Sequence, residues 1–92
     1  MMPPQPEAQG HAGTFHVFRY DATGLRGKRM RLLTDLPTND AGDPQDDLIG
    51  HTDVIALDDT PSVFHSLRVH PVDDPDTIAI VAIDQLALYD QQ

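Results

Sequence analysis

The sequence predicts an all-β protein, and three observations carry the prediction. Short segments rich in Val, Ile, Leu and aromatic residues recur along the chain, separated by clusters of Pro, Gly and Asp. These segments alternate apolar and polar residues and show no sustained helical period, although residues 80–88 could be read as a helix. The chain has 92 residues, 39% of them apolar, which suffices for one modest core. We therefore expect one small sandwich or barrel.

The N-terminal third divides into a tail, a strand and a loop. Residues 1–13 are mostly Pro, Gln, Gly, Ala and His with no periodic apolar pattern, so we expect a disordered tail ahead of a single domain over residues 14–92. Residues 14–20 alternate Phe15 and Val17 with polar side chains and favour a strand. Two glycines then predict a loop over residues 21–28.

The middle of the chain predicts two strands around a long loop. Residues 29–36 place Met30 and Leu32 on one face and end at Pro37. Residues 38–47 contain no apolar side chain larger than Ala, and their Gly, Pro, Asn and Asp residues are typical of an exposed loop. Residues 48–57 resume the apolar pattern and predict a third strand.

Three apolar segments complete the chain. Residues 63–69 alternate and predict a fourth strand, after a turn at residues 58–62. Residues 77–83 are apolar on both faces, so we expect them to form the most central strand. Asp84 and Gln85 then interrupt the pattern before the last apolar segment, residues 86–89.

The order of these elements carries a resemblance to a known fold family. A strand follows Gly27, a bend falls near Gly50, and Asp84-Gln-Leu precedes the last segment. Residues 27–89 thereby resemble the Src-homology-3-like small barrel of the KOW type, found in many short bacterial proteins. The resemblance implies about five short strands, a one-turn helix before the last strand, and binding of proteins or nucleic acid through loops. Residues 14–20 would add an extra N-terminal strand. The chain departs from the family at the bend, where the family's second Gly would fall at or next to Asp53, and in its longer, more acidic first loop.

Charge is distributed unevenly along the chain. The formal net charge is −9; residues 1–33 hold five of the six basic residues, whereas residues 34–92 hold Arg68 against thirteen Asp. Such a chain repels phosphate backbones, which disfavours nucleic acid as a partner and leaves only residues 19–31 as an anion-facing stretch.

We expect a non-catalytic accessory or regulatory protein that binds a larger protein, with a basic surface, through an acidic face. The alternative is an acidic inhibitor or immunity-type protein whose Asp side chains imitate the phosphates of nucleic acid. The expected partner contacts are Asp43, Asp46, Asp47, Asp58 and Asp59 on the acidic side, and Arg19, Arg29 and Arg31 on the basic side.

Other classes of function find little support. The hydroxyl residues lie outside any nucleophile-elbow motif, so we expect no enzyme. His51, His65 and His70 lie near several Asp in the sequence, but His65 and His70 differ in strand parity, so we expect no metal and no cofactor. The chain has no Cys, no secretory signal pattern and no apolar run long enough for a bilayer. These features predict a cytoplasmic protein without a membrane partner and leave its oligomeric state open.

Overall fold

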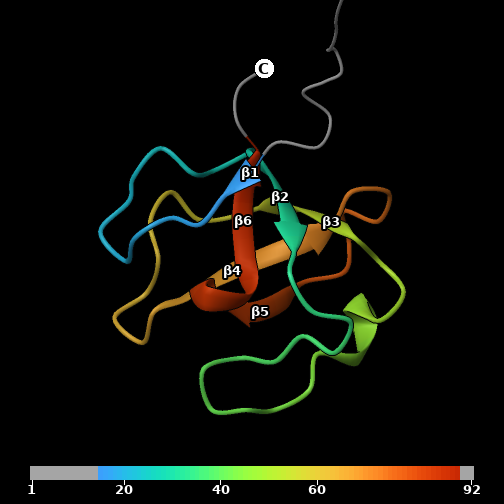
Figure 1. Cartoon of the computed structure of the whole chain (residues 1–92). Coiled ribbons are helices and arrows are strands. Elements are labelled where there is room, and N and C mark those ends of the chain that lie inside the picture. The colour runs from blue at the N-terminus through green and yellow to red at the C-terminus, as the bar shows by residue number, and fades with distance from the viewer. Residues whose placement is uncertain (1–14, 90–92) are drawn as a thin grey trace, which may run out of the picture.

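The computed structural model describes residues 15–89, and these form one six-stranded antiparallel sheet (Figure 1). The strands are β1 Phe15–His16, β2 Arg29–Leu32, β3 Asp53–Ala56, β4 Ser66–Pro71, β5 Ala79–Ala82 and β6 Leu86–Tyr89. Their order in the sheet is β1-β6-β2-β3-β4-β5. The helical segments of residues 15–89 are two 3-10 turns, η2 Asp46–Leu48 and η3 Ile83–Gln85. The prediction of an all-β domain with five short strands and one added N-terminal strand is confirmed.

The core lies on the inner face of a strongly turned sheet. In Figure 1, β6 and β2 run across the direction of β4, so the sheet is strongly twisted. In β2, Met30 and Leu32 are buried, as the alternation predicts, and Met30 pairs with Val54 on one side and Leu88 on the other. The buried cluster consists of Leu25, Met30, Leu32, Leu48, Val54, Ala56, Leu67, Val69, Ala79, Val81 and Leu86.

The first strand is shorter than predicted. β1 pairs with β6 only through Phe15 opposite Tyr89 and His16 opposite Leu88. The chain then leaves the sheet, and Phe18 packs against the core. The predicted tail, residues 1–13, and the start of this strand lie outside the described residues. Within the described part of the chain, no helix is long and apolar enough to cross a membrane.

The second strand ends earlier, and the third strand begins later, than the pattern suggests. β2 ends at Leu32, and the backbone N–H of Leu33 donates to the carbonyl of Gln85 at 2.9 Å, in the register that pairs Leu32 with Leu86. β3 begins only at Asp53, because Leu48 closes the turn η2 and Gly50 has a φ of +89° that reverses the chain. Leu48 is fully buried although two Asp precede it.

The fourth strand starts at Ser66 and not at Val63. His65 has a φ of +60°, a left-handed conformation that a strand cannot contain. Val63 and Phe64 consequently leave the sheet and are exposed. The strand extends further than expected at its other end, where Pro71 pairs with Val54.

The prediction that residues 77–83 form the most central strand is wrong. β5 lies at the edge of the sheet, with Ile78 58% and Ile80 42% exposed, while the smaller Ala79 and Val81 pack inward. The edge is covered by the β2–β3 loop, since the N–H of Ile80 donates to Gln45 Oε1 and that of Ala82 to the Thr38 carbonyl, both at 3.0 Å. A sequence that is apolar on both faces therefore does not distinguish a central strand from an edge strand whose N–H groups are bonded by a loop.

Candidate functional site

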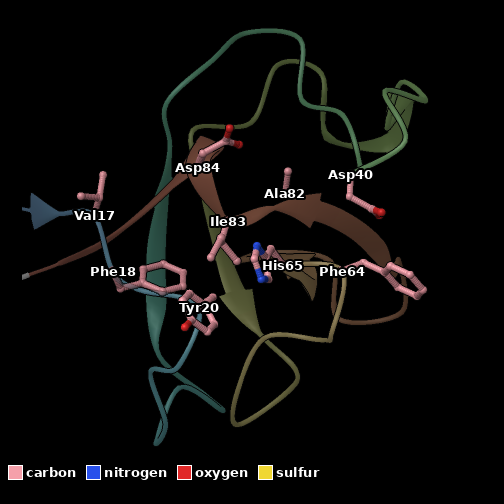
Figure 2. Close-up of a pocket in the computed structure, with 9 residues that line it drawn as sticks. All are labelled: Val17, Phe18, Tyr20, Asp40, Phe64, His65, Ala82, Ile83 and Asp84. Atoms are coloured by element: carbon pink, nitrogen blue, oxygen red, sulfur yellow. The ribbon is translucent and has the colours of Figure 1, made fainter.

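An open groove of about 520 Å³ lies where four segments of the chain meet (Figure 2). Its lining residues are Val17, Phe18 and Tyr20 after β1, Asp40 in the β2–β3 loop, Phe64 and His65 before β4, Ala82 at the end of β5, and Ile83 and Asp84 in η3. Figure 2 shows two sides: the carboxylates of Asp84 and Asp40 with Ala82 between them, and, facing them, aromatic side chains.

The aromatic side is built on a tight turn. The rings of Tyr20 and His65 are stacked, with centroids 4.8 Å apart and planes 22° from parallel. The N–H groups of Phe64 and His65 donate to the side chain and carbonyl of Ser62, at 3.2 and 2.9 Å. The left-handed His65 completes this turn, and Phe64 remains 69% exposed. A large exposed aromatic residue is thus held by a backbone that is already ordered.

Hydrogen bonds connect the segments beneath the groove. The N–H of Ile83 donates to the carbonyl of His65 at 3.0 Å, joining η3 to the turn before β4. Gln85 bonds Thr38 twice, accepting from its N–H and donating to its hydroxyl, both at 2.8 Å. The β2–β3 loop, the turn and η3 therefore form one preformed frame, and binding requires little ordering of it.

The two carboxylates of the groove differ in their partners. Asp40 accepts a hydrogen bond at 3.0 Å from the hydroxyl of Ser66, a polar residue that is only 3% exposed. Asp84 is exposed, and within residues 15–89 it has no hydrogen bond or ion pair. Lys and Arg are missing from the groove's described lining, so its negative charge is not compensated there.

Ser66, His65 and Asp40 lie close together but are not arranged as a nucleophile with its base. The Ser66 hydroxyl donates to the Asp40 carboxylate, and the His65 ring stacks on Tyr20. Within the described chain, the His65 ring makes no hydrogen bond to either residue. A catalytic serine has its base in hydrogen-bond contact with its hydroxyl, and within the described residues His65 and Ser66 do not make that contact.

Three of the predicted acidic contacts lie on the β2–β3 loop, next to the groove residue Asp40. Asp46 and Asp47 begin the turn η2 and are exposed. Asp43 is also exposed, and its N–H donates to Asn39 Oδ1 at 2.9 Å, a bond that shapes the loop. The structure thus places these carboxylates on one ordered loop.

The other two predicted acidic contacts are in the β3–β4 turn. Asp58 pairs with Arg68 at 2.6 Å, and the hydrogen bond from that guanidinium, opposed by partial burial, lowers the pKa of Asp58 below its ordinary value of 3.8. Asp59 is exposed, and its carbonyl accepts from the N–H of Leu25 at 2.9 Å. The charge of Asp58 is therefore paired with that of Arg68 within the molecule.

The predicted basic contacts have intramolecular partners. Arg19 pairs with Asp21 at 3.3 Å, and Arg29 with Asp53 at 2.7 Å. The guanidinium of Arg31 lies over the Phe15 ring, 5.7 Å from its centroid. The three do not line the groove.

Asp53 organises the outer face of β2, β3 and β6. Its side chain is 10% exposed and also accepts a hydrogen bond at 2.8 Å from the hydroxyl of Tyr89, whose pKa is raised chiefly by burial. A second, smaller pocket of about 250 Å³ lies beside it and contains His51, which approaches Asp73 at 3.9 Å. Among residues 15–89, no three His, Cys, Asp or Glu side chains are grouped to hold a metal ion.

Sequence reasoning missed most of the groove. Phe64 and His65 were expected within a strand, yet Pro61-Ser62 immediately before them is a turn signal that could have placed them outside it. The Asp84-Gln85 interruption did indicate a turn, and η3 lies there. The pairing of Tyr20 with His65, 45 positions apart in the sequence, has no local signal.

These observations define a small all-β domain that carries a preformed groove with an aromatic side and an acidic side. The chain belongs to a family described as a family of unknown function, DUF7161, which its residues 17–88 match. The match includes every lining residue of the groove and begins just after β1. No curated protein and no solved structure matches the chain.

Proposed function

We propose that this chain is a small non-catalytic accessory or regulatory protein that binds a larger protein, with the groove at the centre of the contact. The observation that carries the proposal is the exposed aromatic side of the groove, above all Phe64, held on a hydrogen-bonded frame. Rigid aromatic side chains supply much of the binding energy in protein interfaces, because they bury a large area and lose few rotamers.

The proposed partner has a basic surface. Asp40 and Asp84 lie in the groove, and Asp43, Asp46 and Asp47 extend the negative charge along the adjoining loop. The net charge of −9 would attract a basic partner over a distance and speed the encounter. Asp58 contributes less than the sequence suggested, because Arg68 neutralises it.

The proposal includes a likeness to the Src-homology-3-like barrels and a cytoplasmic location. The likeness is supported by β2, which begins two residues after Gly27, and by the one-turn helix η3 directly before β6. The location is supported by the absence of Cys from the sequence.

Affinity capture from a lysate of the source organism tests the proposal. The baits are the wild-type chain, the groove variant Phe64→Ser with Asp84→Lys, and the control Asp76→Lys, which changes an exposed carboxylate outside the groove lining. Each bait is used with and without nuclease, and the captured proteins are identified by mass spectrometry. We expect one stoichiometric protein with the wild type and the control, and its loss with the groove variant.

Other results would change the assignment. A partner retained equally by the groove variant would place the contact elsewhere on the surface. Capture of a nucleic-acid enzyme would favour the alternative, an inhibitor that imitates phosphates with its Asp side chains. Recovery that vanishes with nuclease would point to residues 19–31 as a nucleic-acid contact and overturn the proposal.

A further inference from the structure

The groove offers an occupant negative charge on one side and aromatic faces on the other. Asp84 and Asp40 lie opposite His65 and Phe64 (Figure 2). Ala82, the residue between the two carboxylates, has a short side chain that leaves the space between them open. The occupant's chemistry must therefore suit both sides at once.

The cation that balances these carboxylates does not come from the described part of the chain. Arg19, Arg29 and Arg68 pair with aspartates outside the groove, and Arg31 lies over Phe15. Arg26 and Lys28 do not line the groove either. An apolar occupant alone would leave Asp84 desolvated without a partner, which is unfavourable. Charge complementarity thus calls for a cationic side chain from the binding partner.

Of the two cationic side chains, arginine fits the groove better. Its guanidinium is flat and weakly hydrated, so it can stack on a ring while its N–H groups pair with a carboxylate in a fork. A lysine ammonium is compact and strongly hydrated, and loses more on entering between aromatic faces. The stacked rings of Tyr20 and His65 and the exposed Phe64 provide such faces.

The groove has room for more than one side chain. Its volume of about 520 Å³ lies within the range of roughly 300 to 1,000 Å³ seen for small-molecule sites. The end of the groove at Val17, Phe18 and Ile83 is apolar. We propose that the groove binds an extended segment of the partner in which an arginine adjoins an apolar residue. The guanidinium lies between the aromatic rings and the two carboxylates, and the apolar side chain contacts Phe18 and Ile83; this inference rests on the proposed function.

Three synthetic peptides test the inference on the full-length, nitrogen-15-labelled chain. The first is acetyl-Gly-Ser-Leu-Arg-Ser-Gly-amide; the second and third replace its arginine by lysine or by citrulline, which keeps the planar shape without the charge. Each is titrated while the amide resonances are followed by NMR. We expect shifts at residues 64–66 and 82–84, with the arginine peptide bound about 3- to 10-fold more tightly than the lysine peptide and the citrulline peptide weakest.

Matched variants assign the contacts. Asp84→Asn should lower the affinity for the arginine peptide about 3- to 5-fold, because it removes one charge of the pair. Phe64→Leu should lower it by a similar factor, since it keeps apolar bulk but removes the ring. The control Asp76→Asn makes the same charge change outside the groove lining and should leave the affinity unchanged. The amide spectrum of each variant shows whether the fold is intact.

Each outcome separates this inference from the proposed function. Equal binding of the arginine and lysine peptides would contradict the inference that the groove binds arginine, and the proposal of a basic partner would stand. Shifts confined to residues outside the groove, or no shifts at all, would overturn the groove as the peptide site, while a protein captured by the wild type could still dock elsewhere. Arginine-specific binding in the groove combined with failure to capture any protein would sustain the site and contradict the proposed function.

Discussion

Arg68 holds the carboxylate of Asp58 through its Nε and Nη2 groups, and the pair fastens the β3–β4 turn to β4. The pKa of Asp58 is lower in the folded chain than in the unfolded chain, so ionised Asp58 stabilises the fold. This contribution is complete above the ordinary value of 3.8 and is lost as the pH falls toward the lower pKa of the folded state.

We predict that Asp58→Asn lowers the urea midpoint at pH 7 and that the difference from the wild type shrinks below about pH 4. Urea denaturation at several pH values measures both effects. Asp59→Asn is the matched control, because that neighbouring carboxylate is exposed and has no cationic partner within residues 15–89. A loss of stability that stayed constant down to pH 3 would show that the charge of Asp58 is not its cause.

The hydroxyl of Tyr89 stabilises the nearly buried carboxylate of Asp53. Its O–H donates to Asp53, which Arg29 also contacts. We predict that Tyr89→Phe lowers the free energy of unfolding by about 0.5 to 1.5 kcal/mol, because Asp53 loses one of its two side-chain donors. Urea denaturation at pH 7 provides the measurement.

Tyr20→Phe serves as the control for this change, since the hydroxyl of Tyr20 makes no hydrogen bond within the described residues. Because burial raises the pKa of Tyr89, the folded chain should also hold its proton above pH 10, and its stability should fall as the pH rises through that range. Equal losses for the two variants would argue against the bond to Asp53.

The β2–β3 loop acts on the sheet as a cover for its free edge. Gln45 accepts the hydrogen bond of the Ile80 N–H, a group that would otherwise face solvent at the edge strand. We predict that Gln45→Ala lowers stability by about 0.5 to 1.5 kcal/mol, speeds hydrogen exchange of the Ile80 amide and increases self-association. Hydrogen exchange by NMR and analytical ultracentrifugation measure these effects.

Gln45→Glu keeps an acceptor oxygen at the same place and should retain the protection of Ile80. If the alanine variant exchanged no faster than the glutamate variant, the loop would not be what protects the edge.

Local patterns predicted the existence of all six strands, and in β2 and β3 the alternation matches the buried face, whereas both residues of β1 are exposed. They did not predict the ends of the strands or the position of β5 in the sheet, because these depend on residues that are distant in the sequence. The pattern did not show that β5 lies at an edge of the sheet, where Gln45, 35 positions away in the sequence, accepts the N–H of Ile80. Local patterns did not predict the groove for the same reason. Its lining comes from four segments that only the folded sheet brings together, those of Tyr20, Asp40, His65 and Asp84.

For the molecule as a whole, residues 15–89 form one sheet around one buried cluster. We predict that removal of residues 1–13 leaves the urea midpoint unchanged, because the cluster that forms the core lies within residues 25–86. Removal of residues 1–18 should lower the midpoint, since it deletes β1 and the core-packed Phe18. Urea denaturation of the three chains measures the effect, and a lower midpoint for the shorter deletion would extend the domain into the predicted tail.

The pairing of Phe15 with Tyr89 places the beginning of β1 next to the end of β6. A two-residue hairpin turn could join these strands directly, because they are antiparallel neighbours. The sheet could then be built from a circular permutant whose new ends lie in the exposed turn around Asp74, outside the groove lining. The domain could equally be inserted into a loop of another protein, with both connections entering at one point and the groove left accessible.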